Sequence, residues 1–187
     1  MDTSFITINT HSSIRLQSKQ GTVIYVDPYG FNTSPHDADL ILVTHTHFDH
    51  FSPEDIAKVR TPHTAFVMPA LNMREFIEAG FTNEDAAFLT PGEHAMPLPG
   101  IEIDGLRVYV AGDTDDLPQN RSIACDIALV PVGGTYTMNA REAAAFVNAL
   151  RPAVAIPEHY GTVAGSPKDG KTFASLVDPQ IEVVFKL

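Results

Sequence analysis

The sequence predicts a single domain of mixed α/β or α+β class that spans residues 1–187. Short apolar, β-prone segments alternate with helical segments along the chain, and strands in both halves of it end near histidine or aspartate residues. A chain of 187 residues is long enough to bury a hydrophobic core in one domain. Hydrophobic residues make up 44% of it, which indicates a globular protein. These patterns leave the order of the strands open.

Four strands are expected before the first functional motif. Residues 5–8 and 14–16 are β-prone segments on either side of a polar turn, and a second turn leads to a strand that ends at Asp27. Residues 40–43 form an apolar run that predicts a fourth, buried strand. Asp27 precedes a proline and can be an ordinary turn residue, so its position alone leaves its role open.

Three histidines and one aspartate lie just past the fourth strand, where α/β sheets usually place their sites. In an extended backbone His45 and His47 point the same way, and the turn that follows lets Asp49 and His50 face a second metal. Imidazole and carboxylate groups are ligands of zinc and similar first-row metals, and burying so many of them without a cation would be costly. The sequence therefore predicts a metal site.

Two helices are expected after this motif. Ser52 can cap free N–H groups, Pro53 suits the first helical position, and the two acids that follow favour the positive end of the helix dipole. The first helix therefore spans about residues 52–60. Residues 64–68 are a β-prone strand, and residues 71–79 form a second helix closed by a glycine.

The second half of the chain repeats the alternation of strands and helices. Alternating segments around an Asp-Gly turn predict a hairpin over residues 101–110, whose second strand leads to Asp113. Asn139 and Glu142 form a capping box for an alanine-rich helix. This helix spans residues 139–151, and a buried strand over residues 127–132 precedes it. A strand over residues 153–156 leads to His159, and a helix over residues 171–177 and a closing strand over residues 181–185 follow.

The charge balance argues against a nucleic-acid partner. Lys and Arg total 12 against 23 Asp and Glu, which gives a formal net charge of −11, and no cluster of basic residues could follow a phosphate backbone. A small anion could still bind, because metals would dominate the local field. We therefore expect a small-molecule substrate and no nucleic acid.

The sequence also predicts a cytoplasmic protein without a membrane partner. No apolar run approaches the ~20 residues that a membrane span needs, and the amino terminus lacks the basic and apolar regions of a signal peptide. Cys125 is the single cysteine, so no internal disulfide can form. The sequence leaves the oligomeric state open.

Four motifs, in order, resemble those of the metallo-β-lactamase superfamily. The motif of residues 45–50 matches the His-x-His-x-Asp-His signature, and Asp27 matches an aspartate that supports this loop. Gly112-Asp113-Thr114 and Pro157-Glu158-His159-Tyr160-Gly161-Thr162 match the later metal-binding segments. Three segments are most similar to bacterial metal-dependent hydrolases related to ascorbate-6-phosphate lactonase: Tyr25-Val26-Asp27-Pro28-Tyr29, Ala111-Gly112-Asp113-Thr114-Asp115 and Gly133-Gly134-Thr135-Tyr136-Thr137-Met138.

The resemblance implies a four-layer αββα sandwich that holds two divalent metal ions. Zinc is the first choice, and manganese or iron would suit the same ligands. Metal 1 would be bound by His45, His47 and a further histidine, metal 2 by Asp49, His50 and His159, and Asp113 would bridge the two. Asp49, Asp113 and His159 would take part directly in catalysis. Asp27 and His11 would lie beside the ligands, although His11 can equally be a solvated turn residue.

His94 is the expected third histidine of metal 1. It is the only histidine between His63 and His159, it follows a Thr-Pro-Gly segment typical of the family, and it lies 19 residues before Asp113. The strand pair that precedes the Asp113 hairpin in relatives is shortened here, and residues 95–100 resemble a loose loop. The alternative is therefore that His94 is a loop residue and that metal 1 is weakly held.

We therefore expect a binuclear metal-dependent hydrolase that uses a metal-bound hydroxide on a small ester, lactone or phosphoester. Coordination lowers the pKa of water from about 15.7 to ~7, which makes a nucleophile at neutral pH. The sequence has no Gly-x-Ser-x-Gly motif for a serine nucleophile. The alternative function is a metal-binding protein of the same fold with a degenerate site and no hydrolytic turnover.

Overall fold

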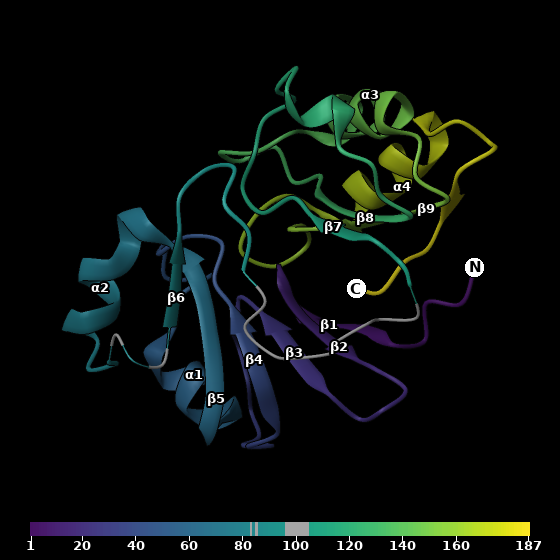
Figure 1. Ribbon diagram of the computed structural model, residues 1–187. Helices are drawn as coiled ribbons and strands as arrows, with labels where there is room; N and C mark the ends of the chain where they lie inside the picture. The colour runs from purple at the N-terminus through teal and green to yellow at the C-terminus, as the bar shows by residue number, and fades with distance from the viewer. Residues whose placement is uncertain (83, 85, 96–104) are drawn as a thin grey trace. The chain divides into compact units, whose positions relative to one another are not determined.

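The computed structural model describes residues 1–82, 84, 86–95 and 105–187 of the chain. The chain divides into two compact units (Figure 1). The N-terminal unit is Ser4–Asp104, and the C-terminal unit is Gly105–Leu187 together with Met1–Thr3. Each unit contains one β-sheet with its own helices. The organisation of residues 1–187 as a single domain stays a prediction from the sequence.

The N-terminal unit is built on a six-stranded sheet whose strands follow one another in sequence order, β1-β2-β3-β4-β5-β6 (Figure 1). The pairs β1–β2 and β2–β3 are antiparallel, and the later pairs are parallel. Consequently β3, β4 and β5 all end at the same edge of the sheet. The strands are β1 (Ile6–Thr10), β2 (Ser13–Gln17), β3 (Val23–Val26), β4 (Ala38–Leu42), β5 (Arg60–Pro69) and β6 (Ala86–Leu89).

Two helices pack on this sheet through one hydrophobic cluster. Helix α1 (Pro53–Val59) contributes Ile56 and Val59, and α2 (Met73–Glu78) contributes Phe76. All three side chains are fully buried together with strand residues such as Ile41. Full burial of each large apolar side chain contributes about 1.5–3 kcal/mol, so this cluster fixes the helices against the strands.

The start of α1 is held by a network around Asp55. Ser52 Oγ accepts a hydrogen bond from Asp55 N at 3.2 Å, which confirms the predicted cap. The Asp55 carboxylate in turn accepts bonds from Gly30 N at 2.9 Å, Phe31 N at 3.0 Å and Lys58 Nζ at 3.0 Å. Burial alone would raise the pKa of Asp55, but the bond from Lys58 and those from the backbone outweigh it, so the pKa is lowered.

Replacing Asp55 by asparagine should therefore lower the free energy of unfolding by about 2–3 kcal/mol at pH 7, because these donors lose a charged acceptor. A lowered folded pKa means that the contribution is complete above the ordinary carboxyl pKa of 3.8 and is lost as the pH falls through the folded value. Urea titrations at pH 7 and pH 3 measure the difference. Glu54→Gln is the matched control, because exposed Glu54 also pairs with Lys58 yet should cost under about 1 kcal/mol. Equal losses in the two variants would contradict the role of Asp55.

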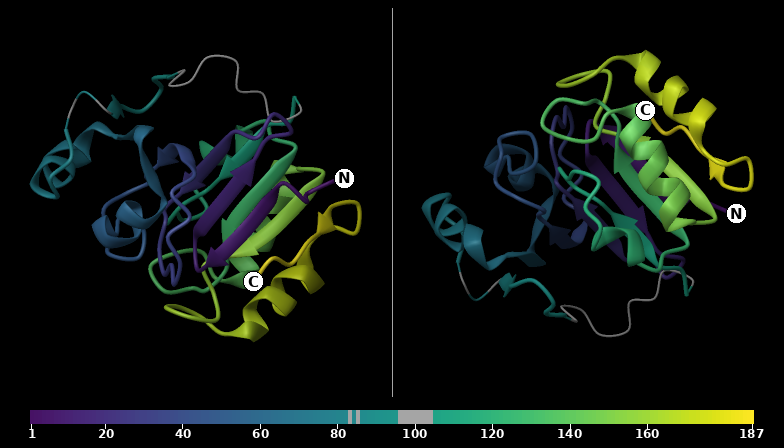
Figure 2. Two further views of the ribbon diagram at one scale, coloured as in Figure 1. Left: turned by 90° about the horizontal axis from the view of Figure 1, so that it is seen from below. Right: turned by 90° about the horizontal axis from the view of Figure 1, so that it is seen from above.

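The C-terminal unit is built on a four-stranded sheet of order β10-β9-β8-β7, in which the described pairs are parallel. Both helices pack on one face of it (Figure 2). The elements are β7 (Val108–Val110), β8 (Ile127–Pro131), α3 (Ala140–Leu150), β9 (Val154–Glu158), α4 (Pro167–Leu176) and β10 (Glu182–Val183). Every residue of β8 and β9 is buried, and for β8 the near-continuous apolar sequence predicts this.

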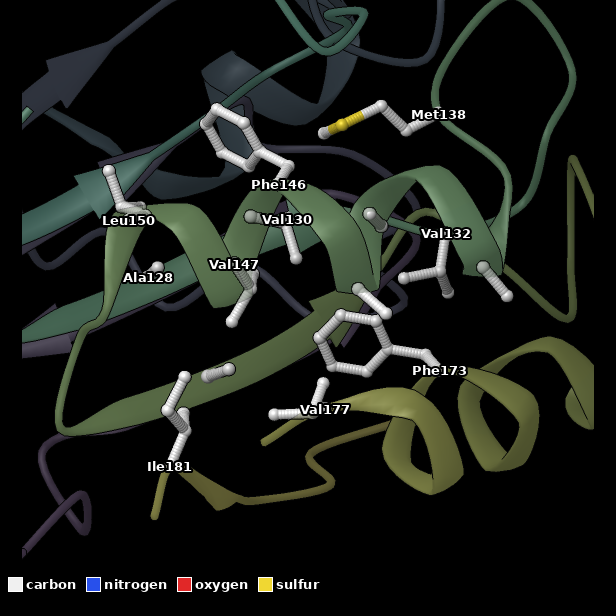
Figure 3. Close-up of a cluster of buried hydrophobic side chains, with 14 of the residues drawn as sticks. Ala128, Val130, Val132, Met138, Phe146, Val147, Leu150, Phe173, Val177 and Ile181 are labelled. Atoms are coloured by element: carbon white, nitrogen blue, oxygen red, sulfur yellow. The ribbon is translucent and has the colours of Figure 1, made fainter. Parts of the chain in front are cut away.

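The core of this unit lies between α3, α4 and the sheet. Figure 3 shows Val147 of α3, Phe173 of α4 and Val177, which directly follows α4, gathered with strand residues such as Val130. The capping box of Asn139 and Glu142 starts α3 as predicted: Asn139 Oδ1 accepts from Glu142 N at 3.1 Å, and Glu142 Oε2 accepts from Asn139 N at 2.9 Å.

Several predicted elements have different boundaries in the structure. Helix α4 starts at Pro167 rather than at residue 171, because Ser166 and Asp169 form a second capping box. The predicted helix over 71–79 is a 3-10 turn, η1 (Ala70–Asn72), followed by α2. Strand β6 and the 3-10 turn η3 (Asn120–Ser122) were not predicted.

The hairpin predicted over residues 101–110 lies partly outside the described residues. Its second strand corresponds to β7, which pairs in parallel with β8. Of the helices in the described part of the chain, none has both the length and the apolar content needed to cross a membrane.

Candidate metal centre

The predicted metal motif follows β4 at the edge where the parallel strands end. Strand β3 runs beside β4 and ends just before Asp27, and Asp27 N donates to Leu42 O at 3.0 Å. Asp27 and Thr44 therefore come together although they are far apart in the sequence. Parallel pairing thus explains how an early aspartate can support a later loop.

Asp27 is fully buried and binds this loop at three points. Its Oδ1 accepts from Thr44 N at 2.8 Å, and its Oδ2 accepts from Thr44 Oγ1 at 2.6 Å and from His50 Nδ1 at 2.7 Å. A proton on Nδ1 directs Nε2 of His50 towards a cation, which is how carboxylates orient ligand histidines. The supporting role that the family resemblance implies for Asp27 stays a prediction, and these three hydrogen bonds are the contacts through which it would act.

The hydroxyl of Thr44 performs a similar task for His45. Because Thr44 Oγ1 donates to Asp27, it can accept from His45 Nδ1, which lies 3.1 Å away. His45 Nε2 then lies 2.9 Å from His47 Nδ1, and the His45 and His50 ring centroids are 4.1 Å apart. Two nitrogens bound to one tetrahedral zinc ion at about 2.0–2.1 Å lie roughly 3.4 Å apart, so the His45–His47 contact is somewhat closer than a shared ion would set. Sequence reasoning missed Thr44, and its place directly before His45 is the signal that could have found it.

The structure brings His11 to this motif. His11 follows β1, is fully buried and has a positive φ of 53°. Its Nε2 lies 3.1 Å from Asp49 Oδ2, and its ring centroid is 5.8 Å from that of His50. Metal-ligand atoms of His11, Asp49 and His50 all lie within 4.8 Å of one another. His11 is therefore buried beside Asp49 and His50 rather than in a solvated turn, and its role at the metal site stays a prediction.

His94 has a different environment. It lies in the exposed segment after β6, in the same unit as His45 and His47. Among the residues that the structure describes, the groups of three or more side chains able to hold a metal do not include His94 or His47. The assignment of His94 as the third histidine of metal 1 stays a prediction.

The C-terminal unit brings Asp113 and His159 together. Asp113 follows β7 and His159 follows β9, and these strands flank β8 in a parallel sheet, so both residues lie at the same edge. His159 Nε2 is 3.1 Å from Asp113 Oδ1, and His159 is almost completely buried. His159 also has a positive φ of 58°, which few residues other than glycine adopt.

The donor atoms in both units fit a divalent metal. They are imidazole nitrogens and carboxylate oxygens, largely buried, and carried on neighbouring strand ends. Buried carboxylates beside histidines are costly in an apolar interior unless a cation or a proton compensates them. Zinc, manganese and iron all accept this nitrogen and oxygen set.

Comparisons with known proteins agree with this assignment. A family model for the beta-lactamase superfamily domain matches residues 5–159. The UPF0173 metal-dependent hydrolase of Methanosphaerula palustris is 34% identical, over 90% of this chain and 88% of that protein. A crystal structure from Parabacteroides distasonis, described as a metal-dependent hydrolase, has a TM-score of 0.80 and 30% identity, over 97% of this chain and 92% of that chain.

A more distant structure supports the fold alone. The metallo-β-lactamase fold protein YhfI of Bacillus subtilis has a TM-score of 0.70 and 16% identity, over 94% of this chain and 88% of that chain. The family model and the Parabacteroides distasonis structure confirm the mixed α/β fold of the metallo-β-lactamase type, which the resemblance of four sequence motifs predicted. The chain belongs to the beta-lactamase superfamily, among its metal-dependent hydrolases of the metallo-β-lactamase fold.

Proposed function

We propose that this chain is a binuclear hydrolase of small esters, lactones or phosphoesters. The observation that carries the proposal is the buried group of His11, Asp49 and His50, in which Asp27 fixes the orientation of His50. His45 and His47 would add two imidazoles from the same loop. Asp113 and His159 would supply the bridging carboxylate and the last histidine, as their motifs do in the family.

The chain's own groups would prepare the site before substrate arrives. Bound divalent metals supply an acidified water and polarise the scissile carbonyl or phosphoryl oxygen. Asp27 would hold the proton on His50 Nδ1, and Thr44 would accept the proton on His45 Nδ1, so the Nε2 atom of each ring would be the one that binds a cation. Asp49 and Asp113 bring negative charge that offsets the metals, which preorganises the site electrostatically.

The substrate is proposed to be a small molecule, with zinc as the first choice of metal and the cytoplasm as the compartment. A net charge of −11 repels polyanions, whereas a small anion can approach a site whose local field the metals dominate. Metal analysis of the purified protein, followed by assays on p-nitrophenyl esters, lactones and phosphodiesters, tests the proposal. Turnover that requires bound metal supports it, whereas bound metal without turnover on any class supports the metal-binding alternative.

One pair of variants tests which histidine completes the site. His11→Ala should lower bound metal by about one equivalent per chain, because His11 Nε2 lies 3.1 Å from Asp49 Oδ2 in a buried cluster. His94→Ala should also lower bound metal, from about two towards about one per chain, if His94 is the third histidine of metal 1 as predicted. It should retain the wild-type content if the exposed segment after β6 is only a loop. Elemental analysis after dialysis against a mild chelator measures both. Loss of metal in His94→Ala alone would instead assign the third-histidine role to His94.

A further inference from the structure

The backbone carbonyl of His159 lies against Gly133. A Cβ atom added at Gly133 would be 2.3 Å from His159 O, whereas real Cβ contacts essentially never fall below 3.0 Å. Gly133 is not among the residues with positive φ, so an alanine there meets no backbone strain of its own. Glycine is therefore required at this position for its size, because the carbonyl of a predicted metal ligand occupies the space of a side chain.

The segment that contains Gly133 also meets the loop before α4. A Cβ at Gly165 would lie 2.7 Å from Gly133 Cα and 3.1 Å from Gly133 O, so the two stretches of backbone pack directly on each other. Gly165 has a φ of +60°, and Ala164 beside it is buried. Gly133 consequently has little room to retreat from His159.

This packing acts where the backbone of His159 is strained. A left-handed conformation costs a non-glycine residue roughly 1–2 kcal/mol, and surrounding contacts must hold it there. Val132 N donates to Glu158 O at 3.1 Å, so residues 132 and 133 contact the last residue of β9 and His159, which follows it. Together these contacts hold the backbone from which the His159 ring projects.

The other end of this segment, at Met138, lies beside Thr114, which follows the predicted ligand Asp113. Met138 N donates to Thr114 O at 3.2 Å, directly after Asp113 in the chain. The segment is closed on itself by a hydrogen bond from Gly134 N to Met138 O at 3.2 Å and by a bridge between Gly133 and Asn139. One short loop therefore contacts the backbone at His159 and at Thr114, the residue after Asp113, and the His159 and Asp113 side chains lie 3.1 Å apart.

We propose that Gly133 is a positioning residue for the metal centre: it holds the His159 carbonyl, and the loop of residues 132–139 fixes the distance between His159 and Asp113. This inference rests on the proposed function, because it assumes that both side chains bind metal. A methyl group at Gly133 would push the His159 carbonyl by more than the ~0.5 Å within which a functional site must hold its geometry. The His159 ring would then leave its place relative to Asp113.

Gly133→Ala should weaken zinc binding by about 10–100-fold, the range observed when groups that orient metal ligands are removed. Zinc affinity is measured by competition with a chromophoric chelator, and the coordination geometry by the visible absorption of the cobalt-substituted protein. Thermal unfolding of the metal-free protein shows separately how much the methyl group disturbs the fold. A changed cobalt spectrum together with weaker zinc binding is the expected result.

Gly170→Ala is the matched control. It adds the same methyl group in the same unit, also without positive φ, but the new atom would meet the Tyr160 ring at 2.8 Å instead of the ligand backbone. It should change the unfolding temperature and keep wild-type zinc affinity and the wild-type cobalt spectrum. Wild-type affinity in a folded Gly133→Ala protein, or equal losses in both variants, would overturn the proposal.

If Gly133→Ala does not fold, Gly165→Ala replaces it in the test. The added methyl group would contact Gly133 rather than His159, so zinc binding should also become weaker, but by a smaller factor. Unchanged zinc affinity in that variant would also overturn the proposal. The wild-type titration separates the two levels of inference. A wild-type protein that binds no zinc, manganese or iron contradicts the proposed function itself, whereas tight binding in the wild type and in Gly133→Ala contradicts only the role of Gly133.

Discussion

Replacing Asp113 by alanine should abolish hydrolysis and lower the metal content. In the proposed centre this carboxylate is the anion that two cations share, so without it they repel each other and one is lost. Its Oδ1 already lies 3.1 Å from His159 Nε2, within the reach of a common metal. Removing a group that only orients a metal ligand lowers metal affinity or activity by about 10–100-fold. Loss of a direct ligand should therefore lower kcat/KM by more than about 100-fold.

Asp115→Ala is the control for this prediction. Asp115 lies two residues further along the same segment and is exposed to solvent, so its removal subtracts the same charge without touching the site. It should keep wild-type metal content and rate, and its stability should change by less than about 0.5 kcal/mol. Wild-type turnover in Asp113→Ala, with metal content measured on the same sample, would exclude the binuclear mechanism.

The parts of the fold that sequence reasoning predicted correctly depend on neighbouring residues. The cap at Ser52 and the capping box at Asn139 start their helices where expected, because these signals act over a single turn. The apolar sequence of β8 predicted a strand buried along its whole length. Strand β6 has only four residues, all partly exposed, so neither length nor alternation distinguished it.

The position of His11 could not be predicted from periodicity. His11 lies between β1 and β2, and His50 follows β4, so their approach depends on the strand order and on the bend of the β1–β2 turn. Hydrophobic patterns indicate which residues are buried but leave the order of the strands open. The contact of Gly133 with the His159 carbonyl could not be predicted from the sequence either, because a glycine is equally common in turns.

Replacing Asp27 by asparagine should weaken metal binding by about 100-fold, although the side chain keeps its size. Asparagine can still accept from Thr44 N through its oxygen, as Asp27 Oδ1 does now. Its NH₂ group would then occupy the position of Oδ2, which accepts from both Thr44 Oγ1 and His50 Nδ1. A donor at that position requires His50 Nδ1 to accept, which moves the ring proton to Nε2, the nitrogen that must bind the metal.

The loss should therefore be one of metal affinity more than of folding. Zinc competition titrations should show a loss of affinity near the upper end of the ~10–100-fold range observed when orienting groups are removed. The hydrogen bond between Thr44 and His45 should also weaken, because Thr44 Oγ1 would no longer donate to a carboxylate. Asp39→Asn is the matched control: Asp39 Oδ2 accepts only from Val23 N among its described hydrogen bonds, at 2.8 Å in the same unit, and this variant should keep wild-type affinity. Equal affinity in Asp27→Asn and wild type would show that Asp27 supports the loop without setting the proton on His50.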